Sequence, residues 1–215
     1  MNNSAYFFHE QLHRSANVMQ RLSNYPLTVC GAGALGANIV ESLARQGFTS
    51  IRVIDRDRIE ERNLSTQPYY LGDVGAFKSK ILANSLYRAI GVKLDARMDE
   101  LTGTNAVRLL KDSTLVVDAF DNSVSRQTLK DYCAGVNVEC LHAGLANGYA
   151  EVIWNENYRV PSASQDDICD YPLARNLVML TVAVTCESII KYIVAGEKQS
   201  LTITLDDFVI KPFAF

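Results

Sequence analysis

The sequence predicts an α/β protein with a doubly wound, mostly parallel sheet, helices on both faces and an antiparallel C-terminal extension. Short apolar strands alternate with helical segments through most of the 215 residues. A glycine-rich turn, GAGALG at residues 31–36, joins the first strand to a helix. Acidic residues end two of the buried strands, at the edge where sheets of this kind bind ligands. We expect one domain over residues 1–215, including a helical arm at 1–24.

The first half of the chain supplies the strands and helices of the parallel part. The arm is stopped by Pro26, which cannot continue a helix. LTVC and SIRVID are short apolar runs typical of buried strands, and the helix between them closes at Gly47, a common C-cap residue. The predicted elements are a helix at 4–22, a strand at 27–30, a helix at 34–46, a strand at 50–55, a helix at 77–90, a weaker strand at 94–98 and a helix at 104–111.

The second half carries the strongest strand, STLVVDAF, which is followed by a helix that Asp121-Asn122 opens. A turn at Asn147-Gly148 separates two further strands, and Gly196 closes a long apolar helix. The predicted elements are a strand at 113–120, a helix at 124–134, strands at 138–144 and 148–154, a polar irregular loop at 155–172, a helix at 176–195 and one or two strands within 200–213.

Composition limits the classes of function. Hydrophobic residues make up 48% of the chain, enough for a core without disulfides, and the formal net charge is −3. That charge argues against a nucleic-acid or anionic-membrane partner. No secretory signal and no apolar run that spans a bilayer is expected. The five cysteines form no C-x-x-C pair, which favours a reducing, cytoplasmic location.

The glycine loop predicts a Rossmann-like nucleotide site. Gly31 permits the tight turn, Gly33 lets the backbone approach phosphate, and Gly36 lets the helix pack closely. The N-terminus of the helix adds N–H groups and a partial positive charge for an anion. Asp55 ends the second strand close to the roughly 20-residue separation expected of a ribose-binding acid. NAD and ATP both carry such a ribose, so this observation leaves both open.

Polar residues further along the chain favour ATP. Asp57, Asn63, Gln67 and Lys78 gather beside the expected phosphate end, and the Lys78 ammonium would offset phosphate charge. A solvent-exposed helix face is an equally good reading of Lys78 alone. The strand VVDAFDN ends in Asp118 and Asp121, and a carboxylate there can hold Mg²⁺ against a triphosphate. Capping of the next helix by Asp121-Asn122 is compatible with that role.

Taken together, the motifs resemble the ThiF/MoeB/HesA type of adenylation domain in the ubiquitin-activating enzyme superfamily. The resemblance covers nearly the whole chain, through GAGALG, VIDRDRIEERNL, NLSTQ, DVGAFK, VVDAFDN with Arg126, GYAEVIW and ESIIKYIVAG. It implies Mg·ATP-dependent adenylation of the C-terminal carboxylate of a small ubiquitin-like or sulfur-carrier protein, usually ending in Gly-Gly, or of a peptide. It also implies a homodimer.

The same resemblance assigns roles to residues. Asp55 and the glycine loop would hold the nucleotide, with Asp57 beside them, while Asn63, Gln67 and Lys78 would face the phosphates. Asp121 would coordinate Mg²⁺ and support attack at the α-phosphate. The catalytic set expected on this basis is Asp121, Lys78, Asn63 and Arg62.

One departure concerns a phosphate-binding arginine. The family pattern N-L-x-R-Q reads here NLSTQ, with Thr66 in place of the arginine. Losing a charge-assisted contact of about 1.5–3 kcal/mol would slow turnover about tenfold to a hundredfold or more. Arg62 or Arg58 could compensate, and so could Arg14 or Arg21 from the arm of a second subunit.

Other departures concern metal and cysteine chemistry. The family's paired C-x-x-C zinc motifs are absent, so no zinc is expected. Cys169 lies in the polar loop, but the acidic Asp166, Asp167 and Asp170 around it disfavour a reactive thiolate, and an ordinary loop cysteine is the better reading. His142 follows a strand and is best interpreted as a satisfied core residue.

Three functions therefore compete. The leading one is an ATP-dependent adenylyltransferase, and the second is a catalytically weakened subunit, marked by Thr66, that binds ATP and scaffolds a partner. An NAD-dependent oxidoreductase is suggested only by the shared glycine loop.

Overall fold

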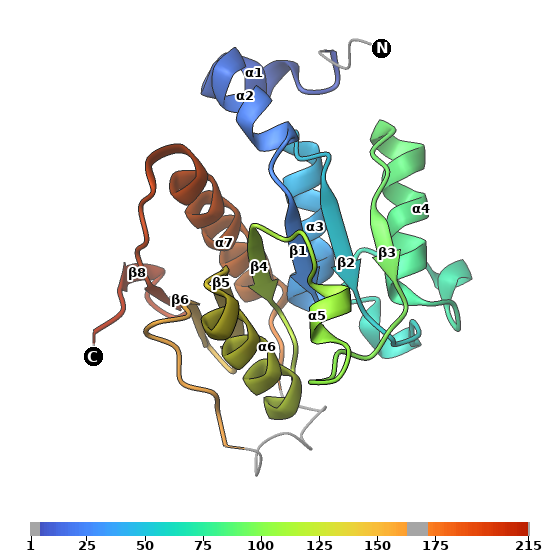
Figure 1. Ribbon diagram of the computed structural model, residues 1–215. Coiled ribbons are helices and arrows are strands. Elements are labelled where there is room, and N and C mark those ends of the chain that lie inside the picture. The colour runs from blue at the N-terminus through green and yellow to red at the C-terminus, as the bar shows by residue number, and fades with distance from the viewer. Residues whose placement is uncertain (1–4, 163–171, 215) are drawn as a thin grey trace.

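A computed structural model describes residues 5–162 and 172–214 of the chain. Its described residues form an eight-stranded sheet in the order β3-β2-β1-β4-β5-β6-β7-β8 (Figure 1). The strands are β1 Leu27–Cys30, β2 Ile51–Ile54, β3 Asp95–Arg97, β4 Leu115–Asp118, β5 Glu139–Ala146, β6 Tyr149–Trp154, β7 Leu201–Thr204 and β8 Val209–Pro212. The helices are α1 Phe8–Arg14, α2 Ala16–Ser23, α3 Ala34–Arg45, α4 Lys78–Ile90, α5 Ala106–Leu109, α6 Ser123–Val136 and α7 Arg175–Ala195.

Strand pairing confirms the predicted fold class. β1 to β5 pair in parallel, and β5 to β8 continue the sheet as antiparallel neighbours. The chain moves outward from β1 to β3 and then returns to the other side of β1 with β4. This reversal between β1 and β4 opens a crevice beyond their carboxyl ends, where doubly wound sheets bind ligands.

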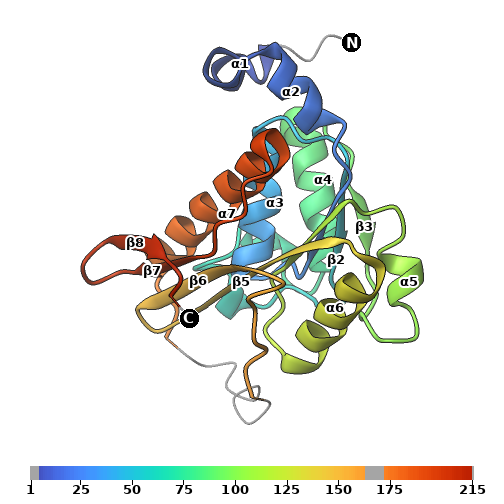
Figure 2. The same cartoon turned by 60° about the vertical axis from the view of Figure 1, so that its left-hand side comes forward.

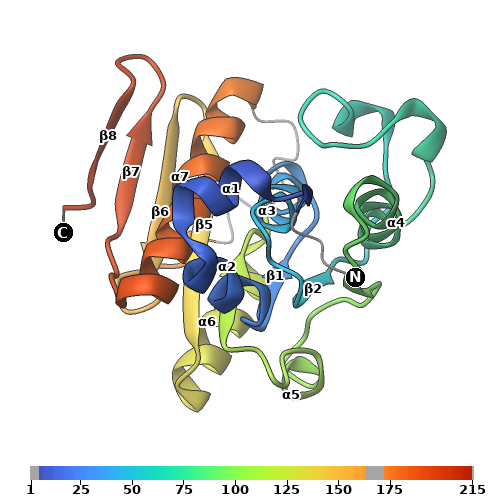
Figure 3. The same ribbon diagram turned by 90° about the horizontal axis from the view of Figure 1, so that it is seen from above.

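Helices cover both faces of the parallel strands. Viewed from above, α3, α4 and α7 lie on one face and α5 and α6 on the other (Figure 3). The β7–β8 hairpin projects from the side of the sheet beyond α7 (Figure 2). Successive side chains of β1 point to opposite faces of the sheet. Leu27 and Val29 pack in the larger core with α3, while Cys30 packs in the smaller core with α6.

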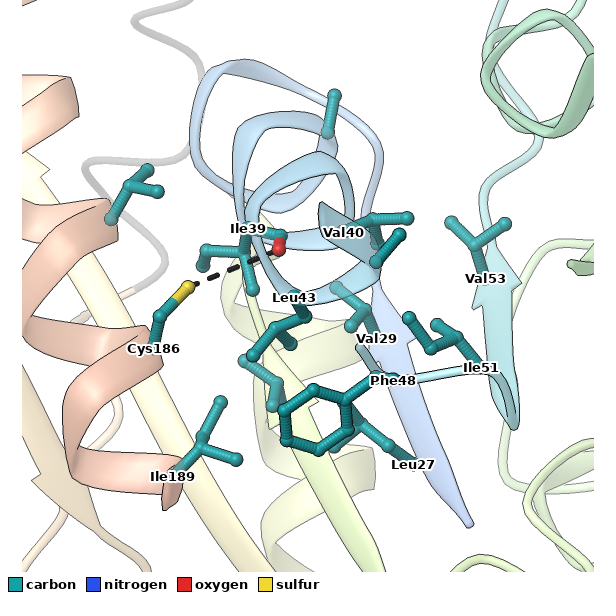
Figure 4. Close-up of a cluster of buried hydrophobic side chains, with 14 of the residues drawn as sticks. Leu27, Val29, Ile39, Val40, Leu43, Phe48, Ile51, Val53, Cys186 and Ile189 are labelled. Carbon is teal, nitrogen blue, oxygen red and sulfur yellow. Dashed lines mark hydrogen bonds between the residues drawn. The ribbon is translucent and has the colours of Figure 1, made fainter. Parts of the chain in front are cut away.

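The larger core joins β1, β2, α3 and α7 (Figure 4). Phe48 and the α3 side chains fill the space between β1 and α7, and the Cys186 thiol of α7 points at the carbonyl of Ile39, 3.9 Å away. Such close packing fixes α3, and therefore the loop before it, relative to the sheet.

α7 corrects one sequence expectation. By length and composition this 21-residue helix could cross a membrane, although no such run was expected. In the fold, 56% of its most apolar stretch is buried, and the helix packs against α3, β5 and β6. Its apolar character is therefore explained by a place in the core of the protein.

The N-terminal arm also differs from expectation. A continuous helix was predicted over 4–22, but α1 and α2 are separated at Ser15, whose φ is +71°. Phe7 before the break and Met19 and Leu22 after it are all buried in the larger core. Neither Gly nor Pro marks this break in the sequence, so helix propensity alone could not locate it.

Smaller differences affect the helix after β3 and the connection between β2 and α4, whereas the C-terminal strands and the polar loop follow the prediction. The predicted helix at 104–111 is reduced to the four residues of α5, and two 3₁₀ turns, Glu61–Asn63 and Leu71–Asp73, occupy the long connection between β2 and α4. Residues 200–213 form a hairpin, β7–β8. The described part of the polar loop, residues 155–162, contains no helix or strand, but Tyr158 within it is buried.

Candidate functional site

A pocket lies at the carboxyl ends of the first four strands, at the crevice between β1 and β4. Each of these strands contributes the loop that follows it, because parallel strands end at the same edge of the sheet. The lining residues are Gly31, Gly33, Asp55, Arg56, Asp57, Lys78, Asp99, Glu100, Leu101, Ala119, Phe120, Asp121, Asn122 and Ser125. The structure therefore brings together most, but not all, of the predicted site residues.

The glycine loop crosses the crevice in a conformation that glycine permits. Gly31 has a φ of +98°, and a Cβ there would lie 2.7 Å from the carbonyl oxygen of Ala119. A Cβ on Gly36 would lie 2.0 Å from the carbonyl oxygen of Gly31, so Gly36 packs against the loop itself. A Cβ on Gly33 would have no atom within 4 Å, so this position faces open space in the wall of the pocket.

α3 begins directly after this loop and offers its first turn to a ligand. Its N-cap is Gly33, which has no side chain to accept hydrogen bonds from that turn. The first intrahelical bond runs from the Ala37 amide to the Gly33 carbonyl, so the preceding amides have no helical acceptor. Free N–H groups and the helix dipole favour an anion at this position.

Asp55 is buried at the end of β2 and braces the loop. Its carboxylate accepts hydrogen bonds from the Ala32 amide at 2.6 Å and the Asp57 amide at 2.7 Å. Burial raises the pKa of Asp55, while these two amides and the Lys78 ammonium oppose the rise. Each carboxylate oxygen has a second lone pair for a ligand hydroxyl.

Lys78 is the first residue of α4 and is 8% exposed. Its amide donates to the Asp57 carbonyl at 2.9 Å, and its Nζ lies 3.8 Å from the Asp57 carboxylate. The reading of Lys78 as a solvent-exposed residue is therefore wrong, because the side chain is buried at the wall of the pocket. Its proposed contact with phosphate stays a prediction.

Negative charge dominates the lining. Asp121 is exposed at the end of β4, and Asn122 caps α6 by accepting from the Ser125 amide at 2.8 Å. Five carboxylates and two cations line the pocket. Among the described residues no three acidic, histidine or cysteine side chains converge as a metal site. Mg²⁺ needs no such cage, since one or two carboxylates and substrate phosphates commonly hold it, and Asp121 fits that pattern.

The N-L-S-T-Q segment lies outside the residues that line this pocket. The Asn63 side chain accepts from the Glu60 amide at 3.0 Å, and Arg62 donates to the Glu60 carboxylate at 2.7 Å. Thr66 is buried, and its carbonyl accepts from the Asn38 side chain at 2.8 Å. Gln67 lines a second cavity between α3 and α4, and its buried Oε1 has no partner among the described residues. Phosphate contacts from these residues stay predictions.

The arginines considered as replacements have partners of their own. Arg14 pairs with Glu10 at 2.7 Å and with Glu187 at 2.8 Å, and Arg21 donates to the carbonyls of Ile193 and Val194. α1 and α2, which carry these arginines, lie beyond the amino ends of the parallel strands (Figure 1), whereas the pocket lies at the carboxyl ends. Arg58 donates to the Gly75 carbonyl at 2.6 Å and stacks on Phe77.

A buried polar cluster lies beside the pocket, and the sequence predicted only some of its members. Asp118 and His142 share a contact of 2.7 Å, the other ring nitrogen of His142 lies 2.8 Å from Asn155 Oδ1, and Tyr158 stacks on the ring. Arg126 lies 3.7 Å from the Asp118 carboxylate and donates to the Tyr158 hydroxyl at 2.7 Å. His142 is thus a satisfied core residue, as predicted.

This cluster keeps a fully buried carboxylate ionised. Burial alone would raise the pKa of Asp118, but the Arg126 guanidinium and the His142 hydrogen bond hold it below its usual value. No sequence signal links Tyr158 or Asn155 to this site, because both lie in a segment that reads only as polar loop.

The cysteines bear on the predicted chemistry only in part. Cys30, Cys133, Cys140 and Cys186 are buried free thiols. Burial raises the pKa of Cys186, and of Cys140 as well, which makes them poor nucleophiles. Cys169 and its acidic neighbours lie outside the described residues.

The fold is that of a Rossmann-like α/β protein with a pocket at the reversal of strand order. Residues 8–201 match the family model described as the ThiF family. The chain belongs to the ThiF family, which confirms the resemblance seen in its motifs.

Relatives extend this comparison. The sulfur carrier protein adenylyltransferase of Thermus thermophilus is 35% identical over 115 residues, covering 52% of this chain and 42% of that protein. The sulfur carrier protein ThiS adenylyltransferase of Bacillus subtilis is 28% identical over 134 residues, 60% of this chain and 40% of that protein. The chain thus spans less than half the length of these curated relatives.

A solved structure shares the fold. The crystal structure of E. coli MccB with ATP superposes with a TM-score of 0.79 at 20% identity, covering 99% of this chain and 71% of that one. At this identity the likeness concerns the fold alone.

Proposed function

We propose that the protein is a Mg·ATP-dependent adenylyltransferase. It activates the C-terminal carboxylate of a small ubiquitin-like or sulfur-carrier protein, or of a peptide, as an acyl-adenylate. The observation that carries this proposal is the convergence of the glycine loop, Asp55, Lys78 and Asp121 on one pocket at the switch point of the sheet.

The chemistry of the reaction suits these residue types. A carboxylate attacks the α-phosphate and pyrophosphate leaves, so two anions must be brought together. The nucleophile is already ionised at pH 7, and the chain has mainly to position the reactants and offset charge. Asp55 would hold the ribose hydroxyls, the first turn of α3 would bind phosphate oxygens, and Lys78 would neutralise them.

The acidic lining explains why a divalent cation is part of the proposal. Five carboxylates against two cations would repel a triphosphate that arrived alone. Mg²⁺ bound at Asp121 would supply the missing positive charge to the phosphate oxygens. Asp57 and Asp99, which line the same pocket, would add to the attraction for that cation.

Relatives support the choice of substrate class. Two curated relatives are named as adenylyltransferases of sulfur carrier proteins, and MccB was crystallised with ATP. A C-terminal Gly-Gly in the partner, a homodimeric state and a cytoplasmic location belong to the same proposal.

One observation favours a second candidate, an ATP-binding scaffold with little catalytic power. Thr66 is buried and carries no charge, and Asn63, Arg62 and Gln67 do not line the pocket. The two cations that line it are Lys78 and Arg56. Such a subunit would bind ATP and a partner without forming an adenylate.

ATP–pyrophosphate exchange separates these candidates. With Mg²⁺ and a small carrier protein ending in Gly-Gly, we expect exchange in the wild-type protein and a loss of about a hundredfold in Asp121→Ala. Asp131→Ala is the matched control, because Asp131 is exposed further along α6 and its side chain contacts Gln127.

The outcomes are distinct. Calorimetry that shows ATP binding, without exchange for any carrier tested, would favour the scaffold. Tight binding of NAD with no affinity for ATP would contradict the proposal and restore the oxidoreductase reading. Equal exchange in Asp121→Ala and wild type would remove Asp121 from the catalytic set.

A further inference from the structure

Ala32, in the middle of the glycine loop, is held through both of its backbone polar groups. Its amide donates to the Asp55 carboxylate at 2.6 Å, and its carbonyl accepts from the Tyr69 hydroxyl at 2.8 Å. Both contacts are buried, where a hydrogen bond has little competition from water. The orientation of the loop between Gly31 and Gly33 is therefore set by two side chains from outside it.

Tyr69 is itself fixed in place. It is 6% exposed and follows the N-L-S-T-Q segment, whose Thr66 carbonyl accepts from the side chain of Asn38 on α3 at 2.8 Å. The same Asn38 amide group donates to the Ala34 carbonyl in the first turn of α3. Segment 63–69 is thus tied to the helix start as well as to the loop.

The hydroxyl is suited to act only as a donor to this carbonyl. Burial raises the pKa of Tyr69 far above its usual range, and the charges of Asp55 and Asp73 raise it further. The phenol stays protonated at every pH at which the protein would be assayed, so the contact with Ala32 persists.

We propose that Tyr69 is a positioning residue for the nucleotide phosphates. Its hydroxyl holds the Ala32 carbonyl, and with it the Ala32–Gly33 peptide, so that Gly33 and the first turn of α3 present their backbone to the phosphate groups. Segment 63–69 then acts on the nucleotide through the glycine loop, whereas an arginine at position 66 would act through charge. This inference rests on the proposed binding of ATP in the pocket.

The test compares Tyr69→Phe with Tyr70→Phe in the full chain. Tyr70 is the adjacent tyrosine, but it is 72% exposed, so it controls for the loss of a phenol hydroxyl in the same segment. Calorimetry measures the dissociation constants of Mg·ATP and of adenosine for each protein. We expect Tyr69→Phe to weaken ATP binding about tenfold, the worth of one buried hydrogen bond.

Adenosine provides the readout that a general loss of structure would not reproduce. It lacks phosphates, so its affinity should change less than about twofold in Tyr69→Phe, which corresponds to less than a typical hydrogen bond. An unchanged ratio of ATP to adenosine affinity, or loss of cooperative thermal unfolding in the variant, would overturn the inference. Failure of the wild-type protein to bind ATP at all would instead refute the proposed function.

Discussion

Asp118 shows how much a single buried charge depends on its neighbours. Its carboxylate is fully buried, yet it contacts His142, Arg126 and the Phe120 amide, which together offset its desolvation. The residue also ends β4, immediately before the loop that lines the pocket. Its carboxylate also accepts from the Phe120 amide at 3.0 Å, so it contacts the loop that carries Asp121.

We predict that Asp118→Asn lowers the free energy of unfolding by about 3 kcal/mol at pH 7, because Arg126 is left buried without its counter-charge. The sign of the pH dependence follows from the lowered pKa of Asp118. Its contribution is present above the unfolded-state pKa of about 3.9 and is lost as pH falls through the lower folded-state pKa. Urea unfolding between pH 2 and 7 measures both effects.

Asp131→Asn is the control for that experiment, since Asp131 is exposed and should change the free energy of unfolding by less than about 0.5 kcal/mol. If Asp118→Asn unfolded with the same pH dependence as wild type below pH 4, the ion pair would not stabilise the fold in the way its geometry indicates.

The glycine loop and α3 form the element on which the site depends most. Gly36 and Gly33 belong to the same G-x-G-x-x-G motif, but their surroundings differ. Gly36 packs against the carbonyl of Gly31, whereas Gly33 faces open space. A substitution at Gly36 should therefore affect folding, whereas one at Gly33 should affect binding of the nucleotide.

We predict that Gly36→Ala unfolds or strongly destabilises the protein, because its Cβ would lie 2.0 Å from a backbone oxygen. Gly33→Ala should keep the wild-type melting temperature within a few degrees, since its φ of −81° suits any residue. The same substitution should weaken ATP binding about tenfold or more by blocking close approach of the phosphate. Thermal unfolding and calorimetry provide the two measurements, and normal ATP affinity in Gly33→Ala would place the phosphates elsewhere.

The sequence predicted the helices and strands much better than it predicted the contacts that loop residues make. Apolar strands and helix caps located β1, β2, β4, α3 and α6 within a few residues, because their burial and capping are local properties of the sequence. The pocket residues Asp55, Lys78 and Asp121 followed from their place at strand and helix ends. The contacts of Tyr69 with Ala32 and of Tyr158 with His142 could not be predicted, because each joins residues that are distant in the sequence.

At the scale of the whole molecule, the N-terminal arm is part of the main core. Leu22 is fully buried with the residues of β1 and α3, and Gly47 at the end of α3 leaves room for Met19. Arg14 and Arg21 attach the arm to α7 through Glu187 and through carbonyls at the end of that helix. The first and last helices of the described fold therefore stabilise each other.

We predict that Leu22→Ala lowers the free energy of unfolding by about 2–4 kcal/mol, the usual cost of emptying a packed leucine site. Leu12→Ala in α1 removes the same atoms from a side chain that is 70% exposed, and it should change stability by less than about 0.5 kcal/mol. Chemical denaturation compares the two variants, and equal effects would show that the arm is not integrated in the core.

The contact between Arg21 and the end of α7 has a consequence for the order in which a newly made chain folds. Its partners are separated by 172 and 173 residues, so the arm emerges from the ribosome long before the carbonyls that it binds. At about 5–20 residues per second, roughly 10–35 seconds pass before α7 is available. During that interval β1 and α3 can already cover Met19 and Leu22 of α2, so the arm joins the core first and its contacts with α7 form last.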